Sequence, residues 1–196
     1  MNIELSMAAF ALVASATPGP VNLVALSSGA RHGWRSSLPY VAGATVGFTA
    51  LLVLVGLGLQ QAARALPMLM QGMRWAGVLF LLYMAFRLLL DSGEIGQSKK
   101  PDRRPSMWAG AAMQWLNPKA WLASVSGIAV YAADGDMARV WLFAAIYFAI
   151  CFASVGAWAV AGSAVSSMLT NARTMRRFNA LMAGLLAISA VVMLWH

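Results

Sequence analysis

Lys119 is the side chain whose position in the sequence points most directly to chemistry. It follows Asn117 and Pro118 inside an apolar run, whereas the other thirteen of the fourteen lysines and arginines lie in connections or near the ends of runs. Asparagine is a good helix N-cap and proline fits the first helical position, so a half-helix should begin here with its amide donors turned into the protein. A helix N-terminus beside a lysine can bind an anion, most simply a carboxylate.

A second break, Thr17-Pro18-Gly19-Pro20, interrupts the first apolar run, and Pro18 lies a hundred residues before Pro118. Proline lacks a backbone donor and clashes with the preceding turn, so carbonyls near this break should lose their helical partners. Such carbonyls could receive an ammonium group. The two breaks together predict a zwitterion site, with Asn22 and Gln114 as further candidates for its lining.

A purely structural interpretation of the same residues stays open. Both motifs also kink helices, and Lys119 could reach the membrane interface with its stem packed in the bundle. Asn22 and Gln114 could each form a hydrogen bond between helices. Against this interpretation, placing a lysine inside the membrane raises the free energy of insertion by roughly 2.5–3.5 kcal/mol, which calls for a partner or a role.

Composition and run length define the elements that must position these residues. Hydrophobic residues make up 61% of the chain and charged residues 10%, and the mean hydropathy is +0.71, so lipid is the expected solvent. With a crossing length of about 20 residues, the pattern predicts an all-α membrane protein with six transmembrane helices. The predicted spans are residues 5–26, 38–59, 68–90, 108–131, 140–161 and 178–195.

The distribution of charge predicts how these spans are oriented. Ten of the fourteen basic residues fall in the first, third and fifth connections, which places both termini outside by the positive-inside rule. Residues 91–107 form a cytoplasmic linker between a first three-helix repeat, 1–90, and a second, 108–196. An odd number of helices inverts the second repeat, so we expect a single transporter domain over 1–196, with two inverted repeats and broken first and fourth helices.

Small and aromatic residues suggest how the helices pack. Gly43 and Gly47 form a GxxxG step, and alanines at 149, 153, 157 and 161 form a stripe at helical spacing, which we expect to mediate close helix packing. Five tryptophans near span ends should anchor the depth of the helices in the membrane: Trp34, Trp75, Trp108, Trp141 and Trp195.

Several functional classes are disfavoured by the residues present. The single cysteine, Cys151, lies in the fifth span and is expected to be a small packing residue, and His32 and His196 lack metal-ligand spacing, so we predict neither a metal nor a cofactor. The predicted spans contain no His, Asp or Glu that could serve an intramembrane enzyme. In so apolar a chain the net charge of +8 reflects the loops and not a nucleic-acid partner.

The motifs and their order resemble the LysE/RhtB family of amino-acid exporters over the whole chain. The residues that carry the resemblance are Thr17-Pro18-Gly19-Pro20, Asn22, Ser27, Gly33, Arg35, Gly43, Gly47, Trp75-Ala76-Gly77 and Asn117-Pro118-Lys119. Within the family, the cysteine and O-acetylserine exporters are the most similar branch. Residues that carry this likeness are Ala25-Leu26-Ser27-Ser28, His32-Gly33-Trp34-Arg35, Ala42-Gly43 and Gly47-Phe48.

The resemblance implies export of amino acids across the bacterial inner membrane, driven by the proton gradient. The chain differs from many relatives at Phe48, where they carry an acidic residue, and at residues 126–131, where a Phe/Pro-rich stretch is common. Lys119 is then the titratable group available for coupling within the spans. A channel, a membrane scaffold or assembly subunit, and a homodimer that completes the pathway at its interface remain alternatives, and the sequence does not identify the amino acid.

Overall fold

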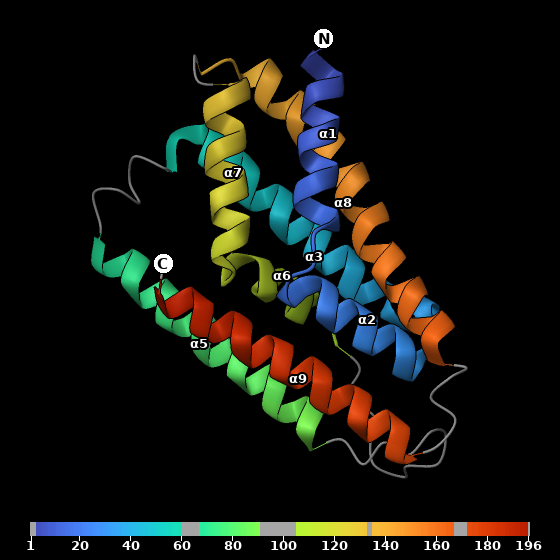
Figure 1. Ribbon diagram of the computed structural model, residues 1–196. Coiled ribbons are helices and arrows are strands. Elements are labelled where there is room, and N and C mark those ends of the chain that lie inside the picture. The colour runs from blue at the N-terminus through green and yellow to red at the C-terminus, as the bar shows by residue number, and fades with distance from the viewer. Residues whose placement is uncertain (1–2, 60–66, 91–104, 133–134, 167–171, 196) are drawn as a thin grey trace.

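A computed structural model describes residues 3–59, 67–90, 105–132, 135–166 and 172–195, and this part of the chain is helical without strands (Figure 1). The helices are α1 (Ile3–Ala16), α2 (Pro20–His32), α3 (Trp34–Leu54), η1 (Val55–Leu59), α5 (Pro67–Leu89), α6 (Met107–Trp115), α7 (Pro118–Tyr131), α8 (Met137–Val165) and α9 (Ala172–Trp195). The all-helical prediction is therefore confirmed.

Two of the described helices are long and apolar enough to cross a membrane, over Trp34–Gly58 and Met137–Val165. The pair α1 and α2 makes a third crossing if it is counted as one span that bends by 62°. The prediction of six spans in inverted repeats is not settled by these criteria. The predicted linker, residues 91–107, lies almost entirely outside the described residues.

Both predicted breaks are present. The first apolar run divides at residues 17–19, and Pro20 opens α2, where its missing N–H removes no helical hydrogen bond. The run around Lys119 divides at Leu116 and Asn117, and Pro118 opens α7. Each break thus ends one short helix and starts another within a single apolar segment.

Glycines bring the backbones of the central helices into contact. A β-carbon on Gly29 of α2 would overlap the Ala159 carbonyl, and one on Gly162 of α8 would overlap the Leu26 carbonyl. The GxxxG step of α3 meets α6 in the same way, since Gly43 lies against the backbone of Met107. The predicted role of this step in close packing is confirmed, and it matters because lipid supplies no hydrophobic drive for helix association.

The alanine stripe of α8 does not pack against the other described helices, although its spacing predicted that it would. The alanines at 149, 153, 157 and 161 are exposed, and α8 instead buries the face that carries Tyr147, Cys151, Val155 and Ala159. The spacing was correct for a helix face, but that face is turned away from the other described helices. The expected packing role within this chain is therefore wrong.

The helices α5 and α9 lie side by side and pack mainly against each other (Figure 1). The link between this pair and the other helices runs largely through α2, beside the start of α9, where Ala30 and Met175 are buried together. The remaining helices form the main body, in which α8 contacts α1, α2 and α3. The breaks are located in this main body.

We expect Gly162→Ala to destabilise the protein by about 1–3 kcal/mol, because the added methyl group would force α2 and α8 apart. Gly156→Ala in the same helix is the matched control, since a β-carbon there would meet nothing within 4 Å. Thermal unfolding in detergent measures both effects. Equal melting temperatures for the two variants would contradict the contact between the α2 and α8 backbones.

Candidate functional site

A cavity of about 40 Å³ lies where the two breaks meet. A cavity needs about 10–15 Å³ to hold one water, so this one has room for a few water-sized groups. Five of the predicted site residues line it, and they come from positions about a hundred apart in the sequence: Gly19, Asn22, Gln114, Asn117 and Lys119. The structure therefore brings together residues that the sequence connected only through their motifs.

The other predicted site residues are placed differently. Thr17 and Pro18 are exposed, and Pro20 is buried in the first turn of α2; none of the three lines the cavity. The Pro118 side chain lies outside the described part of the structure. Thr17 still belongs to the site, because its backbone carbonyl is one of the groups freed by the break.

The Asn22 side chain forms hydrogen bonds to backbone carbonyls at the first break. Its Nδ2 donates to the Ser15 carbonyl over 2.8 Å and to the Thr17 carbonyl over 3.0 Å. Asn22 is buried, and these hydrogen bonds replace the ones that Gly19 and Val21 would donate to the same carbonyls in an unbroken helix. The side chain that was expected to line a binding site also holds the backbone of the break in shape.

Lys119 connects the two breaks directly. Its Nζ donates to the Thr17 carbonyl over 2.8 Å, across 102 residues of sequence. The Thr17 carbonyl thus receives the ammonium group of the lysine itself, and binding of a substrate ammonium group there stays a prediction. Because Asn22 also donates to this oxygen, both of its lone pairs are used.

Tryptophans that the motifs did not single out satisfy further carbonyls at the breaks. Trp158 Nε1 donates to the Ala16 carbonyl over 3.2 Å, and Trp121 Nε1 donates to the Trp115 carbonyl over 2.8 Å. For Trp121 the available signal was its position in the middle of the predicted span 108–131, whereas Trp158 lies three residues from the end of the span 140–161 and gave no such signal. An indole buried in a helix bundle needs an acceptor, and a broken helix offers one.

The start of α7 has the expected geometry. The Asn117 Oδ1 accepts the Lys119 backbone N–H over 3.1 Å, which caps the helix, and Pro118 occupies its first turn. Pro118 has no N–H, and the next amides of α7 already donate to Asn117, so the N-terminus contributes its dipole and not free donors. Lys119 therefore adds a full positive charge to the positive end of the α7 dipole. Among the described residues that line the cavity, Lys119 has the only charged side chain.

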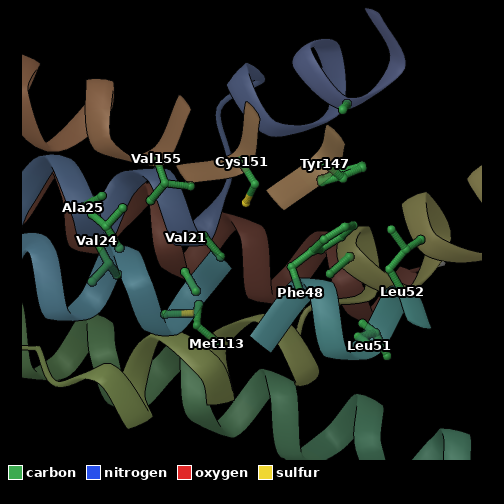
Figure 2. Packing of buried hydrophobic residues seen from close by; sticks show 14 of the residues in the cluster. Val21, Val24, Ala25, Phe48, Leu51, Leu52, Met113, Tyr147, Cys151 and Val155 are labelled. Atoms are coloured by element: carbon green, nitrogen blue, oxygen red, sulfur yellow. The ribbon is translucent and has the colours of Figure 1, made fainter. Parts of the chain in front are cut away.

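The opposite wall of the cavity comes from α3 and α8. The rings of Phe48 and Tyr147 are stacked, with centroids 4.1 Å apart and planes 20° apart. Figure 2 shows the Cys151 side chain pointing from α8 into the interior, between Val21 and Phe48. Cys151 is buried, as expected for a packing residue, but it also lines the cavity, which the sequence did not indicate.

The arrangement has the parts that an α-amino acid requires. An ammonium group at the positive end of a helix dipole can hold a carboxylate, and backbone carbonyls near the same point can hold an ammonium group. The small volume and the stacked rings limit the size of any ligand. These features favour a small zwitterion over a large or multiply charged molecule.

Residues 12–195 match the model of a family described as LysE type translocators. Cysteine/O-acetylserine efflux proteins of Escherichia coli (strain K12) and Shigella sonnei (strain Ss046) are each 29% identical to this chain over 160 residues, which cover 78% of this chain and 78% of each relative. No solved structure gives a significant match. The resemblance inferred from the motifs, including the branch, is confirmed.

We expect Asn22→Ala to destabilise the protein by about 1–3 kcal/mol, because it leaves the buried Ser15 carbonyl without its amide donor. Asn22→Asp should be at least as destabilising, since a carboxylate cannot donate to these oxygens. Asn179→Ala is the control, because Asn179 is also buried but its amide nitrogen has no partner in the described structure. If chemical or thermal unfolding ranks Asn179→Ala as the more damaging change, Asn22 does not hold the break.

Proposed function

Because the chain belongs to the LysE type translocator family, we propose that it is a secondary transporter that exports small neutral amino acids across the bacterial inner membrane. Cysteine, O-acetylserine, threonine and homoserine are the substrates of the expected size. The observation that carries the proposal is the hydrogen bond from Lys119 to the Thr17 carbonyl beside the shared cavity. It puts an ammonium group and a backbone acceptor at the point where two helix breaks meet.

The proposed mechanism is an exchange of partners. An arriving amino acid places its carboxylate on the Lys119 ammonium, at the positive end of the α7 dipole, and its own ammonium group replaces Lys119 on the Thr17 carbonyl. Breaking the lysine contact is then coupled to binding, because the freed ammonium finds the substrate carboxylate. A substrate with a second positive charge would meet Lys119 without compensation, which favours neutral side chains.

The proposed architecture extends the described helices to six spans. Helices α1 with α2, and α6 with α7, serve as broken first and fourth spans of two inverted repeats, with both termini outside. The distribution of basic residues and the hundred-residue separation of Pro18 from Pro118 support this arrangement. The contact between Lys119 and Thr17 would then join equivalent points of the two repeats.

We further propose that export is coupled to protons through Lys119. Tyr147 and Cys151 are the other titratable side chains on the described lining of the cavity, and neither carries a charge at neutral pH in its ordinary form. A lysine that exchanges partners during transport is well placed to release and regain a proton. The acceptor it leaves, the Thr17 carbonyl, stays available to the substrate.

We expect Lys119→Ala to lower the kcat/KM of efflux roughly tenfold to hundredfold, the loss expected for a charge-assisted hydrogen bond. The assay is efflux from preloaded proteoliposomes with cysteine, O-acetylserine, threonine, leucine and lysine, under an imposed pH gradient. Arg177→Ala, which removes an exposed charge on α9, should leave efflux unchanged. Equal background leak of all substrates from correctly folded protein would favour the scaffold, whereas non-saturable flux without accumulation against a gradient would favour a channel.

For Lys119→Gln, we expect the efflux that remains to lose its dependence on the pH gradient, because the amide cannot carry the proton. The measurement is the initial efflux rate with and without a gradient, over a series of external pH values. Gradient-driven export with an unchanged pH profile in this variant would show that Lys119 is not the coupling residue. That result would contradict proton coupling through Lys119 but would not contradict the proposed carboxylate site.

A further inference from the structure

The inner end of the cavity has polar groups that the proposed carboxylate and ammonium contacts do not use. Ser15 lines it from the end of α1, and Tyr147 and Cys151 line it from α8. Ser15 is 9% exposed, and Tyr147 and Cys151 are each 2% exposed, whereas Lys119 is only partly buried. The charged group of the cavity is therefore on its more exposed side, and we refer to the buried set Ser15, Tyr147 and Cys151 as its polar floor.

The Ser15 hydroxyl is the unusual feature of this floor. It is buried and makes no hydrogen bond with proper geometry in the described structure. Tyr147 and Cys151 are its polar neighbours and lie close enough to interact with the serine side chain, but neither is aligned with the serine oxygen as a full hydrogen bond requires. A buried hydroxyl without a partner costs free energy, which a bound group with its own donor and acceptor would recover.

Other buried serines show that an unsatisfied hydroxyl alone does not define this position. Ser27 and Ser124 are also buried without a hydrogen-bond partner among the described residues, but neither lines the cavity. Ser15 combines the unsatisfied hydroxyl with access to the cavity. It is therefore the position where a ligand can supply the missing hydrogen bond.

We infer that Ser15, Tyr147 and Cys151 form the subsite for the substrate side chain, and that this subsite selects a short side chain ending in a hydroxyl or thiol. The inference rests on the proposed function, since Lys119 and the Thr17 carbonyl hold the α-carboxylate and α-ammonium groups toward the outer side. Hydroxyl, phenol and thiol groups each donate and accept, so they match a ligand group that does both. An aliphatic side chain of the same size would leave Ser15 unsatisfied, and the site would discriminate against it.

The stacked rings set the length of this subsite. Phe48 lies against Tyr147 with ring centroids 4.1 Å apart, and both rings line the cavity. Phe143 packs edge-on against Tyr147, with ring centroids 5.6 Å apart, and so supports its position. A floor braced in this way cannot readily recede for a longer side chain, so leucine is excluded by size and valine by polarity. The subsite thereby narrows the proposed substrates: it admits cysteine and threonine and disfavours O-acetylserine, whose side chain is longer than that of leucine and ends in a methyl group.

The test compares ligands that differ only in the hydroxyl group. Efflux of serine and alanine, and of threonine and valine, gives two ratios of kcat/KM for wild type and for Ser15→Ala. In wild type we expect the hydroxyl ligand to be preferred in both pairs, and Ser15→Ala should reduce each preference roughly two- to tenfold. Ser27→Ala is the matched control, since it removes a buried, unpartnered hydroxyl outside the cavity and should leave both ratios unchanged.

A second readout reports binding without transport. Cys151 is the only cysteine in the chain, so its modification by methyl methanethiosulfonate can be followed without background from other thiols. Serine should slow this reaction at lower concentration than alanine does, and Ser15→Ala should remove the difference. If Cys151 does not react with the reagent in wild type, the efflux ratios decide alone.

The outcomes separate this inference from the function on which it rests. Lys119-dependent efflux with equal ratios in wild type and Ser15→Ala would overturn the subsite and leave the exporter intact. Reaction of Cys151 that no transported amino acid slows would also overturn it. Loss of saturable efflux for every amino acid tested would overturn the proposed function, and the subsite with it.

Discussion

The backbone carbonyls of a broken helix inside an apolar bundle must find donors within the protein, and this constraint organises the structure. At the first break, the carbonyls of residues 15, 16 and 17 all accept hydrogen bonds from side chains. Their donors are Asn22 from α2, Trp158 from α8 and Lys119 from α7. Two of these donors come from the second half of the chain, so satisfying the break also joins the halves. The cavity is the space left where these donors converge.

Local chemistry could be predicted from the sequence, because it depends on neighbouring residues. The positions of both breaks, the cap made by Asn117 and the close approach at Gly43 all follow from rules that act within a few residues. The convergence of Asn22, Gln114 and Lys119 on one cavity was also anticipated, though only from the matching positions of two motifs.

What could not be predicted depends on how each helix is rotated about its axis. The alanines of α8 and the row containing Cys151 have similar spacing, and composition alone favoured the alanines as the packing face. The structure buries the other row, because Gly162 and Ala159 admit the α2 backbone on that side. The hydrogen-bond acceptors of Trp158 and Trp121 could not be predicted for a related reason, because they depend on how the helices are positioned relative to one another.

The separate pair of α5 and α9 has a consequence for how the protein is made. Residues 67–89 leave the ribosome well before residues 172–195, yet α9 is the main packing partner of α5 among the described helices. Until the last helix is synthesised, the apolar surface of α5 must therefore be sheltered by lipid or by the insertion machinery. Truncation near the C-terminus would leave an early helix without its main packing partner.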